Sequence, residues 1–174
     1  MLAAIAQARA SVELETYIFA DDQIGRQFLA ALTRAAQTGV RVRVLVDSYG
    51  SLTLSADFFA PLVQAGGEIR FFNPLRFSRF GVRDHRKLLV CDRQLAVIGG
   101  AIIADNYDGD GVTRGWLDVM MKVADAELAT RLTDEFDQIY ANADFAQHPL
   151  PRLRVFRQLR HRIKDEPRLF PIKP

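Results

Sequence analysis

The sequence predicts an α/β fold, a mixed β-sheet with helices on both faces. Short apolar runs and amphipathic helical segments alternate over residues 10–72 in the order strand, helix, strand, helix, strand. Crossovers of this kind build parallel strands. Two further apolar runs, separated by three residues, predict a hairpin at 88–98. A chain of 174 residues is long enough to bury a sizeable core.

Polar residues mark the boundaries of the first elements. Residues 10–19 are mostly apolar and predict a buried strand. Asp21 or Asp22 caps the helix that follows, and Gly39 ends it. Valine occupies every second position of residues 40–46, which predicts a second strand parallel to the first.

The next segment completes the predicted parallel part of the sheet. A short helix at 57–65, closed by Gly66, leads to a third strand at 68–72, which Pro74 stops. The loop at 75–83 then interleaves arginines with phenylalanines. This composition suits a phosphate-bearing or interfacial ligand, but a solvated loop with packed phenylalanines has the same pattern.

The predicted hairpin carries the residues with the most specific chemistry. It ends in Gly99 and Gly100, and His85 and Lys87 precede it. Side chains alternate along an extended segment, so the histidine and the lysine point to the same side. A neutral imidazole is a competent nucleophile toward phosphorus, and the lysine supplies positive charge for phosphoryl oxygens. The glycines let the backbone approach those oxygens, and the scheme requires no metal or cofactor.

The remaining elements follow the hairpin. Residues 104–111 are acidic and glycine-rich, but the twelfth position of a calcium loop is Val119 instead of Glu, so no calcium site is predicted. A strand at 116–123 carries Asp118. Asp125 caps a last helix. The predicted core stripe of this helix consists of Leu128, Leu132, Phe136, Ile139 and Tyr140.

Charge divides the chain into a body at 1–145 and a basic tail at 146–174. Residues 1–151 carry a net charge of −4, and residues 152–174 carry +6. The acidic body argues against a general nucleic-acid surface. Apolar residues recur at helical spacing in the tail, which predicts either a basic amphipathic helix on a membrane surface or a helix packed on the body or a partner.

The N-terminus and the cysteine content indicate the compartment. Residues 1–9 lack the basic start and the sustained apolar core of a secretory signal. The single cysteine, Cys91, excludes an intrachain disulfide and is predicted to be an inert core residue. We therefore expect a cytoplasmic protein.

The reactive segment resembles the motif of the phospholipase D superfamily, His-x-Lys-x4-Asp followed by a Gly-Gly or Gly-Ser pair. The residues that match are His85, Lys87, Asp92, Gly99 and Gly100. The closer similarity is to the bacterial cardiolipin synthase branch, and it runs from about residue 11 to about residue 145. It includes the segments LETYIF at 14–19, GVRVRVLVD at 39–47, FNP at 72–74 and RDHRKLLV at 83–90.

The resemblance implies one half of a phospholipase D-type enzyme that transfers a phosphatidyl group between alcohols at the inner membrane surface. It implies that His85 forms a phosphohistidine, that Lys87 binds the phosphate and that Asp118 accepts the other ring N–H of His85. An exposed strand carboxylate is the alternative for Asp118. Asp92 steadies the hairpin. Substrate contacts are expected from Gly99, Gly100 and Arg83.

The sequence departs from the family pattern in two places. The superfamily uses two copies of the motif, and this sequence holds one. We therefore expect that a second copy of the chain, in a homodimer, or a second half-domain completes the site that binds the phospholipid. Ile102 stands where the cardiolipin synthase pattern has a phosphate-binding asparagine. Two alternatives therefore remain, a homodimeric phosphodiesterase or nuclease and a non-catalytic half that pairs with another half.

Overall fold

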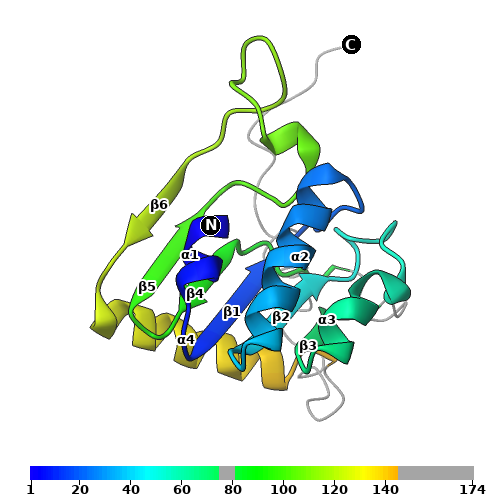
Figure 1. The fold of residues 1–174 in the computed structure, drawn as a ribbon. Coiled ribbons are helices and arrows are strands. Elements are labelled where there is room, and N and C mark those ends of the chain that lie inside the picture. Colours follow the sequence, from blue (N-terminus) through cyan, green and yellow to red (C-terminus); the bar gives the residue numbers. More distant parts are fainter. Residues whose placement is uncertain (75–80, 145–174) are drawn as a thin grey trace, which may run out of the picture. The chain divides into compact units, whose positions relative to one another are not determined.

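The computed structural model describes residues 1–74 and 81–144 of the chain. Its six strands form one sheet in the order β3-β2-β1-β4-β5-β6 (Figure 1). β1 is parallel to β2 and β2 to β3, whereas β4, β5 and β6 are antiparallel to their neighbours. The predicted mixed sheet is confirmed. The strands are β1 Ser11–Thr16, β2 Arg41–Asp47, β3 Glu68–Phe72, β4 Leu88–Cys91, β5 Leu95–Gly99 and β6 Met120–Val123.

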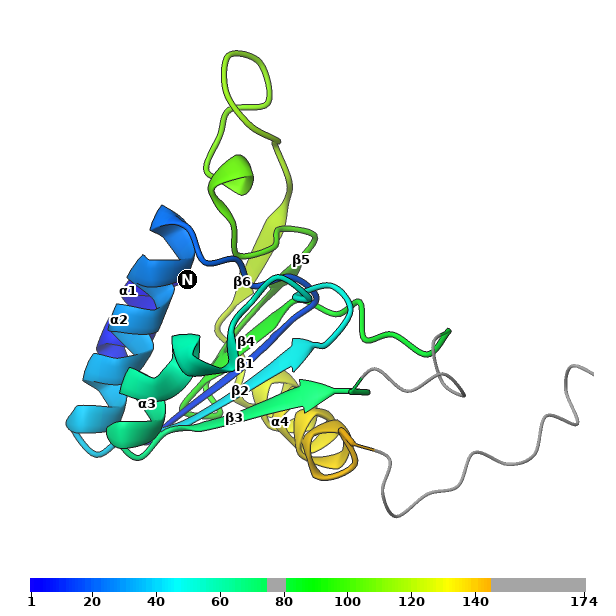
Figure 2. The ribbon, with the colours of Figure 1, turned by 90° about the vertical axis from the view of Figure 1, so that its right-hand side faces the viewer.

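Helices cover both faces of the sheet, as predicted. Figure 2 shows α1, α2 and α3 on one face and α4 on the other. The helices are α1 Leu2–Gln7, α2 Gln23–Gln37, α3 Ala60–Gln64 and α4 Ala126–Ala141, and two 3₁₀ turns lie at Ala56–Phe59 and Asp105–Tyr107. Both predicted caps are confirmed, because the side chain of Asp22 accepts from Gly25 N and that of Asp125 accepts from Leu128 N.

The two faces of the sheet differ in chemistry. Under α1, α2 and α3, alternate residues of the central strands form an apolar core. Its strand members are Val12, Leu14, Val42, Val44, Val46, Leu89, Cys91 and Val97. Burial raises the pKa of the Cys91 thiol to about 12, which agrees with an inert core residue.

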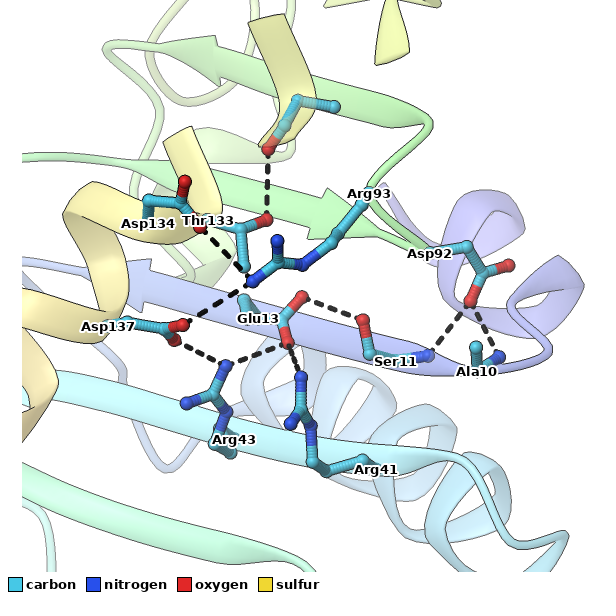
Figure 3. A network of polar contacts seen from close by, with 11 residues as sticks. Ala10, Ser11, Glu13, Arg41, Arg43, Asp92, Arg93, Thr133, Asp134 and Asp137 are labelled. Carbon is cyan, nitrogen blue, oxygen red and sulfur yellow. Dashed lines mark hydrogen bonds and ion pairs between the residues drawn. The ribbon is translucent and has the colours of Figure 1, made fainter. Parts of the chain in front are cut away.

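The face under α4 carries charged side chains between the sheet and the helix (Figure 3). Arg43 lies 3.0 Å from Glu13 and 2.6 Å from Asp137 of α4, and Arg93 lies 3.2 Å from Asp134. The Glu13 side chain is fully buried. We call this set, together with Glu15 and Arg86, the ionic layer. A buried carboxylate such as that of Glu13 needs cationic partners, and Arg41 and Arg43 supply them.

Several boundaries differ from the predictions. The first strand ends at Thr16 instead of residue 19, and α1 was not predicted. The strand predicted at 116–123 begins only at Met120. On α4, the buried residues are Ala129, Thr133, Phe136 and Tyr140, whereas Leu128, Leu132 and Ile139 are half-buried. The apolar stripe is rotated because the centre of the helix faces the ionic layer.

The connection between β5 and β6 projects beyond the sheet (Figures 1 and 2). We call residues 104–119 the arm. Asp110 holds its outer loop by accepting from the backbone N–H groups of Val112, Thr113 and Arg114 at 2.8–3.0 Å. Four large apolar side chains are nevertheless exposed on it, namely Val112, Trp116, Leu117 and Val119. The arm therefore has an ordered backbone and an apolar surface.

The predicted tail at 146–174 and most of the arginine-rich loop lie outside the described residues. No helix of residues 1–74 and 81–144 combines the length and apolar character that a membrane span requires.

Candidate active site

Strand pairing brings the motif residues together at one end of the sheet. β4 runs antiparallel to β1, so the residues that precede β4 lie beside those that follow β1. Leu88 pairs with Ile98 of β5, and Gly99 N donates to Lys87 O at 3.4 Å. The segment that carries His85 and Lys87 is thus flanked by Tyr17 on one side and by Gly99 and Gly100 on the other.

His85 and Lys87 both lie against Tyr17. The ring centroids of His85 and Tyr17 are 4.7 Å apart, and Lys87 Nζ is 5.3 Å from the Tyr17 ring centroid. Lys87 Nζ also donates to His85 O at 2.7 Å. His85 is exposed, whereas only 6% of Lys87 is exposed. The exposed imidazole and the buried ammonium therefore lie on the same side of the site, as their spacing of two residues predicts.

The environment of Lys87 favours an incoming anion. Burial lowers the pKa of the Lys87 ammonium, and the charges of Asp84 and Asp118 oppose that shift. In the described part of the chain, one of its three N–H donors is used, by the His85 carbonyl. A partly desolvated ammonium with free donors is suited to bind a phosphoryl oxygen.

Asp118 lies beside Gly100 and contributes negative charge near Lys87. A Cβ at Gly100 would overlap the Asp118 carboxylate, and a Cβ at Gly99 would overlap the backbone of Val119. Position 99 therefore requires glycine, and a side chain at position 100 would displace the Asp118 carboxylate. Asp118 Oδ1 accepts from Val119 N at 2.7 Å, and no hydrogen bond joins Asp118 to the His85 ring among the described residues. Asp118 is exposed and precedes β6, so the structure brings it to the site without the predicted contact.

Asp92 lies at the opposite end of β4 from His85. Its carboxylate accepts from the backbone N–H groups of Arg9, Ala10 and Ser11 at 2.7–3.1 Å and so ties the hairpin turn to the start of β1. Partial burial would raise the pKa of Asp92, but these donors lower it below its ordinary value. The structure thus separates Asp92 from the reactive pair and gives it a structural contact.

Arg83, an expected substrate contact, and Ile102, which stands where the family pattern has asparagine, have well-defined surroundings. The Arg83 guanidinium lies 3.6 Å from Asp47 and 5.3 Å from the Tyr49 ring centroid, at the end of β2. Ile102 lines an open, largely apolar pocket together with Ile24 and Phe28 of α2. Among the described residues, no group of three His, Cys, Asp or Glu side chains is placed to hold one metal ion.

Three residues of the site, Tyr17, Glu15 and Arg86, do not stand out in the sequence. Tyr17 was assigned to the first strand, although it follows the last paired residue and contacts both reactive side chains. Glu15 and Arg86 are 71 residues apart in sequence and form a two-bond ion pair. The available signal was a pair of glutamates in a strand that is otherwise buried, since a buried carboxylate needs a partner.

A mixed sheet with a His-x-Lys pair at the mouth of its central hairpin defines a phospholipase D-like domain. Nuc from Salmonella typhimurium, a phospholipase D family member of known structure, has the same fold, with a TM-score of 0.60, 20% identity and coverage of 80% of this chain and 84% of that one.

The family assignment follows from the sequence comparisons. Residues 1–140 match the family described as cardiolipin synthase, PLD-like domain. The chain is 37% identical over 113 residues to the major cardiolipin synthase ClsA of Bacillus subtilis, covering 63% of this chain and 23% of that protein. It is 36% identical over 142 residues to cardiolipin synthase B of Salmonella typhi, covering 78% and 34%. The chain belongs to the cardiolipin synthase branch of the phospholipase D superfamily, and it spans about a quarter to a third of the length of these relatives.

Proposed function

We propose that this chain supplies one half of the active site of a phosphatidyltransferase that acts on phospholipid phosphodiesters. The observation that carries the proposal is the packing of His85 and Lys87 on Tyr17, next to a pair of glycines that lie against Val119 and Asp118. The names of the curated relatives support a phospholipid as the substrate.

The proposed reaction has two displacements at phosphorus. A ring nitrogen of His85 attacks phosphorus, the bond from phosphorus to the leaving alcohol breaks, and a phosphohistidine forms. The hydroxyl of an acceptor alcohol then attacks phosphorus, the P–N bond breaks and His85 is regenerated. Lys87 stabilises the negative charge on the phosphoryl oxygens in both transition states. Water in place of the acceptor gives hydrolysis.

The leaving alkoxide must receive a proton, and a single His85 that is bonded to phosphorus cannot donate it. A missing general acid lowers the rate by about 10² to 10⁴. We therefore propose that a second histidine comes from another copy of this chain or from a second half-domain. The match covers 23% and 34% of the length of the two relatives, so the rest of each relative is long enough to contain such a half.

The test is to trap the intermediate. The protein is mixed with a radiolabelled phospholipid in vesicles, quenched in alkali, which preserves phosphohistidine, and digested for peptide mapping. Label is expected on His85 in the wild type, none in His85→Gln, and none in Lys87→Ala at unchanged thermal stability. His148→Gln is the matched control, because no lysine follows His148 at the second position. A fully active Lys87→Ala variant would refute the assignment.

A homodimeric phosphodiesterase is the second candidate. Nuc supports it, because this chain covers 84% of that protein, so the same fold exists in a chain of similar extent. DNA binding that weakens steeply with added salt would favour a nuclease, because each neutralised phosphate releases counterions. Ile102 supports the third reading, a non-catalytic half, and label trapped on His85 would exclude it.

A further inference from the structure

The backbone that presents His85 receives little support from the sheet. Residues 84–87 precede the first paired residue of β4, and the backbone bond from Gly99 to Lys87 is 3.4 Å long. A residue that precedes the paired part of a strand moves more than a paired residue does, unless side-chain contacts hold it. Besides the packing of His85 and Lys87 on Tyr17, three side-chain contacts hold residues 84 and 86 in the described part of the chain, and each is made by a buried carboxyl group.

The first contact fixes the start of the segment. Asp47, at the end of β2, is fully buried, and its Oδ2 accepts from Asp84 N at 2.9 Å. The other carboxylate oxygen accepts from Tyr49 N and Gly50 N at 2.9 and 3.0 Å, which fixes the orientation of Asp47 itself. Asp84 is therefore anchored to a central strand.

The second and third contacts lie on either side of His85. Asp84 Oδ1 accepts from Arg86 N at 3.1 Å, so the two neighbours of His85 are bonded to each other. The Arg86 guanidinium reaches β1, where Nε and Nη2 donate to the two carboxylate oxygens of Glu15 at 2.9 and 2.8 Å. Nη1 lies 3.3 Å from Glu135 of α4. A bidentate arginine–carboxylate pair fixes orientation as well as distance.

We propose that Arg86 and Glu15 are positioning residues that hold the segment of His85 and Lys87 in its reactive geometry. The inference rests on the proposed function for its consequence in catalysis. Since alternate residues face opposite ways, Arg86 points into the ionic layer while His85 and Lys87 face the site. The Glu15 side chain is 1% exposed, so it provides a fixed point for the guanidinium. Misplacement of a reacting group by about 1 Å lowers the rate about 10²-fold.

The experiment compares Arg86→Lys and Glu15→Gln with a matched control, Arg93→Lys. Arg93 also joins the β4 hairpin to α4, by its contact with Asp134, but at the far end of β4. The side chains of Arg86 and Arg93 have similar exposure, 34% and 41%. Lysine keeps the charge and loses the two-bond geometry, so the comparison isolates orientation.

Two readouts separate positioning from general stability. In ¹³C-edited NMR, the His85 ring and Lys87 Cε–H signals should shift and broaden in Arg86→Lys and in Glu15→Gln, and should stay in place in Arg93→Lys. In phosphodiester turnover, kcat should fall about 10²-fold in both site variants with KM within about twofold. Unchanged His85 and Lys87 signals in a folded Arg86→Lys or Glu15→Gln protein would overturn the proposal. The NMR readout needs no turnover, so it stands even if trapping fails and the proposed function is rejected.

Discussion

Glycine at position 100 leaves room for the Asp118 side chain that packs on it. The position of a Cβ is occupied by the Asp118 carboxylate, and Gly100 N donates to Val119 O at 3.1 Å. The same contact holds negative charge near Lys87 and opposes the lowering of its pKa by burial. Because residue 100 has no side chain, Asp118 and Lys87 can both lie at the site.

The variant Gly100→Ala tests this arrangement. The new methyl group displaces the Asp118 side chain, so the rate of phosphodiester turnover should fall about 10²-fold. Because Asp118 is exposed, the free energy of unfolding should change by no more than about 1 kcal/mol, as measured in urea. Gly81→Ala is the control, since no heavy atom of the described residues lies within 4 Å of the place that its methyl group would take. A wild-type rate in Gly100→Ala would show that the position tolerates a side chain.

At the scale of the element, α4 is attached to the sheet through charges. Glu15 of β1 faces Arg86 and Asp84 of the segment before β4, and Arg86 in turn faces Glu135 of α4. Burial and the neighbouring Asp84 carboxyl raise the pKa of Glu15 to about 9, although the Arg86 guanidinium opposes the shift. Glu15 therefore retains its proton at neutral pH.

This proton makes stability depend on pH. Glu15 has a higher pKa in the folded protein, about 9, than in the unfolded chain, 4.5. Its contribution is fully present below pH 4.5 and is lost as the pH rises to about 9, by up to about 1.4 kcal/mol per pH unit. Urea unfolding across this range should show a smaller decrease in Glu15→Gln than in the wild type. Equal slopes for the two proteins would contradict the assignment of the proton to Glu15.

Local patterns predicted some elements well. The bounds of β3 and β4 and the caps Asp22 and Asp125 agree with the structure, because each depends on residues adjacent in sequence. The strand predicted at 116–123 was wrong at its start, because Trp116, Leu117 and Val119 are exposed and unpaired with β5.

Only the part of the candidate site that lies within one short motif was predictable from the sequence. The segment of His85 and Lys87, with the glycine pair, was found from spacing. The contacts to Tyr17 and Glu15 join positions about 70 residues apart, and they depend on the antiparallel pairing of β4 with β1, which no local pattern reveals. The separation of Asp92 from the site has the same origin, since an extended strand of four residues lies between them.

At the scale of the whole molecule, the number of histidines per site decides between the proposed assemblies. If each site requires His85 from two copies, mixed dimers of wild type and His85→Gln are inactive. Phosphodiester turnover should then fall with the square of the wild-type fraction, to about one quarter in an equal mixture refolded together. A linear decrease would mean that one copy of His85 is sufficient. Light scattering should give a molar mass near twice 19.6 kDa for the dimer.

The arm gives the molecule an internal spectroscopic label. Trp116 is the single tryptophan of the sequence, it is 65% exposed, and it lies two residues from Asp118. Its backbone N–H donates to Asn106 O at 2.7 Å, so the residue is attached to an ordered loop. Indole emission moves to shorter wavelength when water is removed from around the ring. Without any added dye, the fluorescence of the native protein therefore reports whether the region next to the site is covered or open to water.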